Sequence, residues 1–207
     1  MRRILIRHAE SQHSLLGRVA DIRSCTGLTE IGIQQAHRLC QRFRASGELH
    51  GCQVLLSSPV RRARETADIL MPSLNTDNVL EDYTLREIHP GIADGLTWQE
   101  YQTTYGGFDL VAEPIRVFAP EGESWQAFLE RVQATLQRIA NEYAGKTVVA
   151  VTHAGFIVAS MLVLFAIPRP GTNARLEPRH TSLTVWEAVA GKWQLERYND
   201  TWHLDRA

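Results

Sequence analysis

The sequence has few cysteines, no long apolar run and no excess of charge of either sign. Its 207 residues include three cysteines, an odd number with no Cys-x-x-Cys spacing: Cys25, Cys40 and Cys52. This pattern argues against a disulfide framework or a zinc ribbon and favours a reducing, cytoplasmic compartment. No apolar run approaches the length of about 18 residues that a membrane span requires, so we expect no membrane contact.

The charges are nearly balanced. Lys and Arg number 22 and Asp and Glu number 23, which gives a net charge of −1. A nucleic-acid-binding domain normally has a basic excess, so we expect no nucleic-acid partner, although this balance still allows a local basic pocket. The opening MRRILIRHAE places charged residues too close together for a secretory signal, which needs about 7–15 apolar residues in a row.

What is present is the composition of an ordinary globular protein. Hydrophobic residues make up 44% and charged residues 22% of the chain, both typical values. At roughly 150 residues per domain, the length predicts one compact domain, with room for an insertion. Such a chain can bury a sizeable core alone, so a monomer and a homodimer are both compatible with it.

Apolar periodicity predicts strands and helices in alternation. Short apolar runs predict strands at 3–6, 54–56 and 147–151, with a weaker strand near 79–80. Helical spacing of apolar residues predicts helices at 28–43, 124–143 and 154–165. Another helix is expected to start at Ser58-Pro59, with Ser58 as N-cap and Pro59 in the first turn. The last two strands, at 182–189 and 192–198, are expected to pair around Ala190-Gly191.

This alternation favours an α/β fold with three layers, α/β/α. The sheet is expected to be mostly parallel, with an antiparallel edge formed by the last strands. The run TVVAV at 147–151 is nearly all apolar and β-branched, which is typical of a central strand covered on both faces.

Residues that suit an anion follow the predicted strand ends. They form four clusters, Arg7-His8, Ser57 to Arg62, Arg86 to His89 and Thr152 to Gly155. Ligands in open α/β sheets bind beyond the carboxyl ends of the strands, so these clusters should meet at one edge. Arginine forks match phosphate oxygens, and we therefore expect a site for a dianionic phosphate.

The same clusters carry a family resemblance. The motifs are Arg7-His8-Ala9-Glu10-Ser11, the segment SSPVRRARETA at 57–67, Leu85-Arg86-Glu87-Ile88 with Gly95-Leu96-Thr97, and Thr152-His153-Ala154-Gly155. In this order they resemble the RHG[ET], SSPLxRAxxTA, LxE…GLT and SHGG motifs of the histidine phosphatase superfamily, in its phosphoglycerate mutase-like branch. Segments 27–32, 121–124 and 199–204 match further family segments, so the resemblance spans nearly the whole chain.

The resemblance implies a single phosphoglycerate mutase-like domain over residues 1–207, with a helical or loop insertion around 92–123. It also implies a metal-independent phosphatase without a cofactor that acts on a small phosphorylated metabolite. His8 is similar to the nucleophile that accepts the phosphoryl group, and Glu87 to the proton donor for the leaving oxygen. The groups that hold the phosphate and stabilise charge are similar to Arg7, Arg62 and His153.

The residues expected to contact substrate include several departures from the family pattern. The resemblance places four residues at the substrate, Ser14, Thr26, Gly27 and Ala154. Ala9 and Ala154 replace glycines, which keeps the positions small but reduces backbone freedom. Ser14 replaces an Asn that touches the phosphate, and His13 replaces a common Trp, so we expect a more polar pocket mouth.

The chemistry explains why these residue types are needed. Transfer of a phosphoryl group to histidine splits one hard displacement into two easier ones. His8 must present a neutral nitrogen while a hydrogen bond to its other nitrogen fixes the tautomer. A protonated Glu87 would donate to the leaving alkoxide and then deprotonate the attacking water.

Three other functions remain open at this point. A phosphoglycerate mutase would pass the phosphoryl group back to the metabolite, but we find no match to the longer basic, Pro-rich segment of cofactor-dependent mutases. A catalytically weak phosphate-binding module would not need the full set of catalytic residue types, so the presence of the whole set argues against this function. A metal hydrolase lacks support because no His-Glu-x-x-His motif is present.

The remaining chemically capable residues are assigned structural roles. Surface charge accounts for Arg23, Arg61 and Arg64, and surface or packing positions account for His37, His50, His89 and His180. His203 is expected to be structural and Cys25 inert. Specificity should reside in the loops 12–26 and 92–123, where four aromatic residues form either a wall of the pocket or helical core: Trp98, Tyr101, Tyr105 and Phe108.

Overall fold

The sheet that organises the protein has six strands. The structure is a computed structural model that describes residues 1–107, 109, 112–167 and 175–205. The strand order is β3-β2-β4-β1-β5-β6. The strands are β1 (Arg2–Arg7), β2 (Cys52–Ser57), β3 (Leu80–Glu81), β4 (Thr147–Thr152), β5 (Leu183–Val189) and β6 (Lys192–Asp200).

The pairing confirms a mostly parallel sheet with antiparallel strands added at one side. β1, β2, β3 and β4 run parallel to their neighbours among themselves, whereas β5 pairs antiparallel with both β1 and β6. Arg7 at the end of β1 lies beside Thr152 at the end of β4, and Ser57 of β2 lies beside Val151. The residues that follow these three strands therefore meet at one edge.

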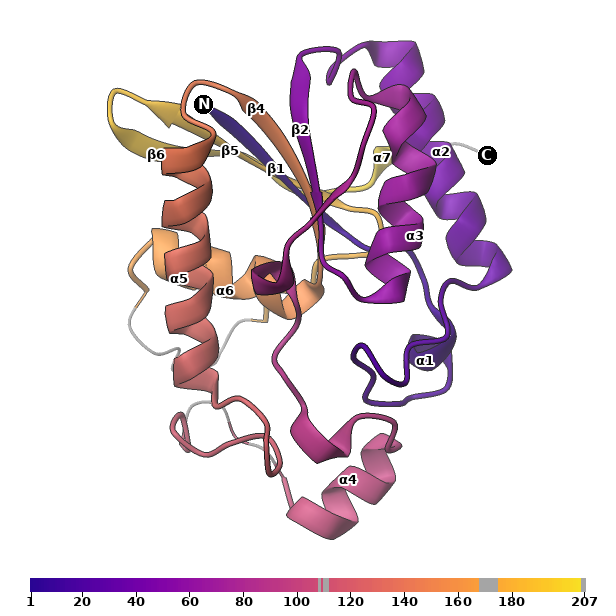
Figure 1. The fold of residues 1–207 in the computed structure, drawn as a ribbon, viewed down its shortest axis with the longest axis vertical. Helices are drawn as coiled ribbons and strands as arrows, with labels where there is room; N and C mark the ends of the chain where they lie inside the picture. Colours follow the sequence, from indigo (N-terminus) through magenta and orange to yellow (C-terminus); the bar gives the residue numbers. More distant parts are fainter. Residues whose placement is uncertain (108, 110–111, 168–174, 206–207) are drawn as a thin grey trace.

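Helices cover both faces of the sheet, which confirms the three-layer α/β/α architecture. Figure 1 shows α5 (Trp125–Glu142) and α6 (Ala154–Leu164) on one side, and α2 (Glu30–Ser46) and α3 (Arg61–Leu70) on the other. Side chains of β4 alternate between the two resulting cores: Val149 and Val151 pack with α2 and α3, and Val148 and Ala150 with α5 and α6. This is why TVVAV is apolar at every position but its first.

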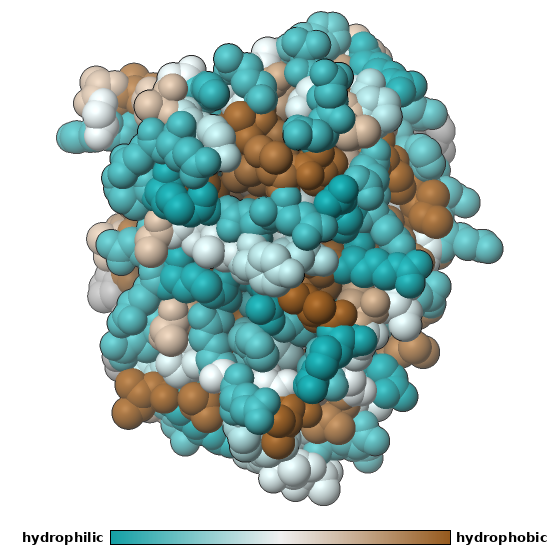
Figure 2. Space-filling model, in the orientation of Figure 1, coloured by the Kyte–Doolittle hydropathy of each residue, from teal (hydrophilic) through white to brown (hydrophobic). Residues whose placement is uncertain are grey.

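Short elements complete the chain. They are the helices α1 (Gln12–Leu15), α4 (Trp98–Tyr105) and α7 (Trp202–Asp205), and the 3₁₀ turns Met71–Ser73, Tyr83–Leu85 and Gly91–Ala93. No helix of the described residues is long and apolar enough to cross a membrane. Figure 2 shows that the face seen in Figure 1 is mostly hydrophilic, with its apolar side chains in separate patches.

The predicted start of α3 is wrong. The helix begins at Arg61, its N-cap is Val60, and no side chain caps it. Ser58 has another role, because its hydroxyl oxygen lies 2.8 Å from His153 Nε2 and 3.4 Å from the Val60 amide nitrogen. Three other helices are capped in the usual way, with Thr29 accepting at the start of α2, Thr97 at the start of α4 and Ser124 at the start of α5.

Segment 92–123 forms a small apolar cluster of its own. Its buried members, together with one residue of the first loop, are Val19, Ala93, Tyr101, Phe118 and Ala119. The rings of Tyr101 and Phe118 stack with their centroids 4.3 Å apart. Backbone bonds attach this segment to the first loop, with Val19 N donating to Leu96 O over 2.8 Å. The cluster therefore lies beyond the edge of the sheet at which β1, β2 and β4 end.

Away from that edge, a buried ionic network fastens the end of the chain to α2. Arg42 Nε donates to Glu48 Oε1 over 2.7 Å, and its Nη2 donates to Asp200 Oδ2 over 2.6 Å. Arg197 Nη1 also donates to both carboxylates. Burial of Asp200 opposes its ionisation, but bonds from Arg42, the Trp202 backbone and Arg197 together lower its pKa to about 2.

Replacing Arg42 by methionine should destabilise the fold. The Arg42 side chain is 2% exposed, and removing it leaves the half-buried carboxylates of Glu48 and Asp200 with too few donors. We expect Arg42→Met to lower the free energy of unfolding by about 3 kcal/mol, measured by chemical denaturation. Arg44→Met, at an exposed position of the same helix, should change it by less than about 0.5 kcal/mol. Equal effects of the two substitutions would contradict this role of Arg42.

Candidate active site

The strand ends and the start of α6 surround one cleft. Arg7, His8, Arg62 and Glu87 line this cleft, which has a volume of about 670 Å³. His153 lies behind the lining, with its ring centroid 5.2 Å from that of His8. The five residues predicted to be catalytic therefore come from four separate segments and gather at the predicted edge of the sheet.

His8 is held in one tautomer by its own backbone neighbourhood. Its Nδ1 lies 2.7 Å from the Ala9 carbonyl oxygen, which can only accept, so Nδ1 carries the proton. Nε2 is then an unprotonated nitrogen, and it accepts a hydrogen bond from Arg62 Nε over 3.0 Å. The Ala9 carbonyl is the tautomer-fixing group that the sequence could not identify.

Arg62 connects His8 with the second histidine. Its Nη2 lies 3.0 Å from His153 Nδ1, and its Nη1 donates to the Ala20 carbonyl over 3.0 Å. Because the guanidinium can only donate, His153 Nδ1 is an acceptor, and its Nε2 donates to Ser58 Oγ. His153 therefore has both ring nitrogens engaged within the protein.

The neighbouring Arg61 points elsewhere. It is exposed, and its Nε donates to Glu65 Oε1 over 2.7 Å, one helical turn further along α3. Arg62, in contrast, is 3% exposed. The SSPLxRAxxTA motif aligns its arginine with Arg62 rather than with Arg61. The structure agrees, because Arg62 is the one of the two that faces the site.

Both inner histidines are neutral. Burial lowers the pKa of His8 and of His153 well below the ordinary value, and the positive charge of Arg62 lowers each further. This agrees with the hydrogen bonds, in which each ring accepts a bond from Arg62. A neutral ring is the form that can act as a nucleophile.

Glu87 is fixed by backbone donors at the start of α6. Its Oε2 accepts from the Gly155 amide over 2.8 Å, and its Oε1 from the Ile88 amide over 3.2 Å. A Cβ on Gly155 would lie 2.1 Å from Glu87 Oε1, so the carboxylate depends on glycine there. Arg131 of α5 fixes the backbone at Glu87, because its Nη2 donates to the Glu87 carbonyl over 3.1 Å.

Arg7 offers a free donor. Its Nη1 donates to the Pro178 carbonyl over 2.6 Å, whereas its buried Nε has no hydrogen-bond partner among the described residues. An unsatisfied buried N–H of a cation is costly unless an anion or water takes the bond. Together with Arg62, it makes this end of the cleft suitable for phosphate.

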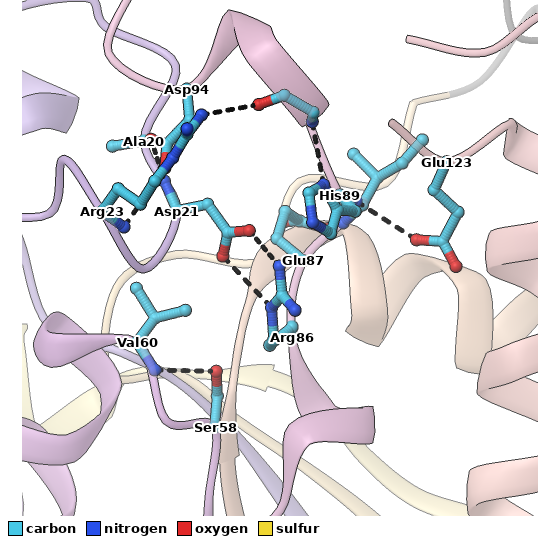
Figure 3. Close-up of polar contacts among 12 residues, drawn as sticks. Ala20, Asp21, Arg23, Ser58, Val60, Arg86, Glu87, His89, Asp94 and Glu123 are labelled. Carbon is cyan, nitrogen blue, oxygen red and sulfur yellow. Dashed lines mark hydrogen bonds and ion pairs between the residues drawn. The ribbon is translucent and has the colours of Figure 1, made fainter. Parts of the chain in front are cut away.

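The loops around the site are joined by ionic contacts, which Figure 3 shows. Asp21 of the first loop pairs with Arg86, the residue before Glu87. Asp94 of segment 92–123 accepts from Ser24 Oγ and, over 2.8 Å, from the Asp21 amide. The first loop, the segment 92–123 and the Glu87 segment are thus fixed relative to one another.

The predicted substrate-contacting residues divide into two groups. Ser14 and Ala154 line the cleft, although Ser14 Oγ is bonded to Ser11 Oγ over 2.9 Å. Thr26 is exposed and Gly27 lies against Glu65, and neither is among the residues that line the cleft. The structure does not bring these two to the site.

The two alanines that replace family glycines cause no backbone conflict. Ala9 and Ala154 are absent from the described non-glycine residues with positive φ, and Ala154 is the first residue of α6. Since an L-residue is strained only where φ is positive, these positions do not require glycine.

The aromatic residues of segment 92–123 take both of the roles considered. Trp98 and Tyr101 line the cleft together with Phe118 and Trp125. Tyr105 instead packs on Tyr101, with the ring centroids 5.4 Å apart. Phe108 lies outside the described residues.

Two further histidines lie near His8, and only His13 was expected at the pocket. The ring centroid of His13 is 6.4 Å, and that of His180 5.7 Å, from the His8 centroid. The sequence assignment of His180 to the surface or to packing missed this position. The position of His180 depends on a strand pairing that the sequence did not predict: β5 runs antiparallel beside β1, so the residues before β5 lie next to those after β1.

The other histidine assignments hold. His37 and His50 are exposed, and His203 is buried and bonded to Thr181. His89 is half-buried, and its Nδ1 accepts from the Gly91 amide. Within the described part of the chain, no group of three or more His, Cys, Asp or Glu side chains is arranged to hold a metal ion.

Comparison with known proteins finds relatives of two kinds. A metal-independent phosphoserine phosphatase of Arabidopsis thaliana is 27% identical over 97% of this chain and 82% of its own length. A probable phosphoglycerate mutase of Yersinia pestis is 30% identical over 97% of this chain and 94% of its own length.

A solved structure has the same fold. The structure of a phosphoserine phosphatase mutant from Entamoeba histolytica, in complex with phosphoserine, matches with a TM-score of 0.78 at 25% identity. The match covers 98% of this chain and 98% of that one.

The family is shown by a match that extends along nearly all of the sequence. The model of the histidine phosphatase superfamily (branch 1) matches residues 3–201. This range includes His8, Arg62, Glu87 and His153. The chain therefore belongs to the histidine phosphatase superfamily, branch 1.

Proposed function

We propose that this protein is a metal-independent phosphomonoesterase that hydrolyses a small phosphorylated metabolite through a phosphohistidine on His8. The observation that carries the proposal is the tautomer of His8: the Ala9 carbonyl holds the proton on Nδ1, and Nε2 is left unprotonated at the cleft. The Nε2 lone pair accepts from Arg62 Nε in this structure, and it must leave that bond to reach a bound phosphoryl group. A nitrogen in this state, beside two arginines, suits attack on a bound phosphoryl group.

In the first step, His8 Nε2 forms a bond to phosphorus while the bond between phosphorus and the ester oxygen breaks. Glu87, in its protonated form, transfers its proton to the departing oxygen, so that an alcohol leaves. Arg7 and Arg62 donate to the phosphoryl oxygens as charge shifts during transfer.

In the second step, water attacks the phosphorus of phosphohistidine. Glu87, now ionised, takes a proton from this water, and the bond between Nε2 and phosphorus breaks. Inorganic phosphate leaves, and neutral His8 and protonated Glu87 are restored. His153 acts through Arg62, because its Nδ1 orients the guanidinium while Ser58 holds its Nε2.

The relatives support hydrolysis and supply the alternative. The Arabidopsis relative and the Entamoeba structure are both named phosphoserine phosphatases, which favours a small phosphomonoester as substrate. The Yersinia relative is named as a probable phosphoglycerate mutase, so mutase action is the second candidate. Stimulation of isomerisation by a bisphosphate would favour it over hydrolysis.

We propose further that the chain is one domain with residues 92–123 as an insertion that shapes the substrate end of the cleft. Trp98, Tyr101 and Phe118 from this segment line the cleft. We also propose a cytoplasmic location. In support, Cys25, Cys40 and Cys52 are all free and buried, as suits a reducing compartment.

The first test removes the nucleophile. His8→Ala should lower kcat on an aryl phosphate by about 10³-fold or more, because no second group replaces a lost nucleophile. Arg62→Met should lower kcat by roughly 10²–10³-fold through lost charge stabilisation. Phosphate release is measured with a chelator present, and the exposed His37→Ala serves as control. Full activity of His8→Ala would refute the proposed nucleophile.

The second test separates the acid from the base role of Glu87. With a poor alkyl leaving group, Glu87→Gln should lower kcat/KM by about 10²–10⁴-fold. The kcat/KM of the variant for a nitrophenyl phosphate should fall much less, because this leaving group needs no proton. Rapid quench with this substrate should then detect accumulated phosphoenzyme. Equal losses with both leaving groups would argue against Glu87 as general acid.

Gly155→Ala gives an independent version of the same test. Its Cβ would lie 2.1 Å from Glu87 Oε1, so the carboxylate must move. We expect the kcat/KM of Gly155→Ala to depend on the leaving group as that of Glu87→Gln does. Its unfolding midpoint should stay close to that of wild type. Gly51→Ala is the matched control, since a Cβ there meets nothing within 4 Å. A Gly155→Ala enzyme with wild-type kinetics would remove Glu87 from the mechanism.

The third test concerns the protonation of His8 and its sign. The folded-state pKa of His8 lies well below the ordinary value of about 6.5. The folded protein therefore binds fewer protons than the unfolded chain once the pH falls below about 6.5, and acid destabilises it. We expect ¹⁵N NMR to find His8 Nε2 unprotonated from pH 7.5 to pH 5. A titration midpoint near 6.5 would contradict the neutral nucleophile.

A further inference from the structure

Two histidines beside His8 have no role in the proposed mechanism. His13 lines the cleft, and its buried Nδ1 has no hydrogen-bond partner among the described residues. His180 has its ring centroid 5.7 Å from that of His8, and its buried Nε2 is likewise without a described partner. Buried ring nitrogens normally find a partner, so two such atoms beside one candidate nucleophile call for an explanation.

The position of His180 is set by Arg7. The Thr181 amide donates to the Arg7 carbonyl over 3.0 Å, and the Arg7 amide donates to the Ser182 carbonyl over 3.3 Å. The Arg7 side chain adds the bond to the Pro178 carbonyl. The segment that carries His180 is therefore bonded on both sides to the residue that precedes His8.

The backbone next to His180 is strained, and its surroundings hold it in place. Thr181 has a φ of 57°, a conformation that costs energy for a β-branched residue. Its hydroxyl donates to the His180 carbonyl over 2.7 Å and accepts from His203 Nε2 over 2.9 Å. Strain that the surroundings fix in this way is typical of functional sites.

The position of His13 is also fixed, from the opposite side of the cleft. His13 lies in the single turn of α1, and its carbonyl accepts from the Arg18 amide over 3.0 Å. The Trp98 amide donates to the Gly17 carbonyl over 3.1 Å, which attaches this turn to the segment 92–123. Among the described residues, the hydrogen bond of the ring to a side chain is a long one, 3.5 Å from Nε2 to Ser14 Oγ.

The second histidine of the family motif cannot supply a free donor. Both ring nitrogens of His153 are engaged, by Arg62 and by Ser58. The buried nitrogens without a described partner around His8 are instead Arg7 Nε, His13 Nδ1 and His180 Nε2. Arg7 and His13 line the cleft, whereas His180 adjoins it beside His8. Three such atoms suit the several oxygens of a phosphoryl group.

Building on the function proposed above, we propose that His13 and His180 bind the phosphoryl group. Each donates a hydrogen bond from its unpartnered ring nitrogen to a phosphoryl oxygen, and the pair takes up a proton when a phosphate dianion enters. The site thus gains positive charge as its ligand arrives.

The charges around the pair explain why the proton is absent beforehand. Burial, together with the positive charges of Arg62 and Arg7, lowers the pKa of both His13 and His180 to about 3. The groups that act on the pair include Arg7 and His8 at the end of β1, Arg62 on α3, His153 before α6, and Asp94 in the segment 92–123. Glu87 and Glu177 also line the cleft. A bound dianion adds two negative charges beside the rings and favours the protonated form.

Inorganic phosphate is the probe that tests the proposal. Its Kd is measured at pH 7 by titration calorimetry in two buffers that differ in ionisation enthalpy, which also counts the protons taken up. We expect His13→Asn and His180→Asn each to raise the Kd about tenfold, as the loss of one hydrogen bond to a charged group does. Wild type should take up about one proton more per phosphate than the double variant, because the ionisation of free phosphate near pH 7 contributes equally to both.

The controls separate binding from folding. His37→Asn, at an exposed position of α2, should leave the Kd unchanged. Thermal unfolding of each variant is measured alongside, and His13→Gln and His180→Gln replace any variant that does not fold. A lower unfolding midpoint with an unchanged phosphate Kd would assign the two histidines to structure and overturn the proposal.

The remaining outcomes are also distinct. An unchanged phosphate Kd with a higher KM for the ester would place the histidines on the leaving group, and would also overturn the proposal. The same preparations are assayed for hydrolysis by wild type and by His8→Ala. If wild type turns over and His8→Ala does not, the proposed function stands whatever the phosphate titrations give. If both are inactive, the proposed function fails independently of phosphate binding.

Discussion

The guanidinium of Arg62 is the group on which the rest of the site depends. One planar side chain, itself buried, donates to His8, to His153 and to the Ala20 carbonyl. Because a guanidinium only donates, these bonds require both rings to present an unprotonated nitrogen to it. Arg62 thereby sets the protonation pattern of the site, and its charge opposes a positive charge on either ring.

The scaffold delivers Arg62 and its partners to one place through the parallel sheet. His8, Ser58 and His153 directly follow β1, β2 and β4, whose carboxyl ends lie side by side, and Arg7 is the last residue of β1. Glu87 comes from a segment without regular structure, so it needs other support. Arg131 bonds to its carbonyl, and the Arg86–Asp21 pair joins it to the first loop. One part of the site is thus built on the ends of strands, and the other on loops held by ion pairs and hydrogen bonds.

Much of this arrangement could be predicted from the sequence. Short apolar strands followed at once by Arg, His or Ser identify the carboxyl edge, and motif order adds the roles of His8, Arg62 and Glu87. The parts that could not be predicted depend on tertiary contacts. Ser58 lies two residues before the N-cap Val60 and accepts from His153 instead, and Thr26 and Gly27 do not reach the cleft. His180 required knowledge that β5 pairs antiparallel with β1.

The central claim is that His8 Nε2 carries the phosphoryl group during turnover. The most direct measurement quenches the enzyme in base during steady-state hydrolysis and maps the phosphorylated residue by mass spectrometry, with ³¹P NMR to identify the bond. The account predicts one phosphoryl group on the peptide that contains His8, bonded to Nε2, stable in base and lost in acid. A phosphoryl group on any other residue, or hydrolysis that continues with His8 never modified, would contradict it.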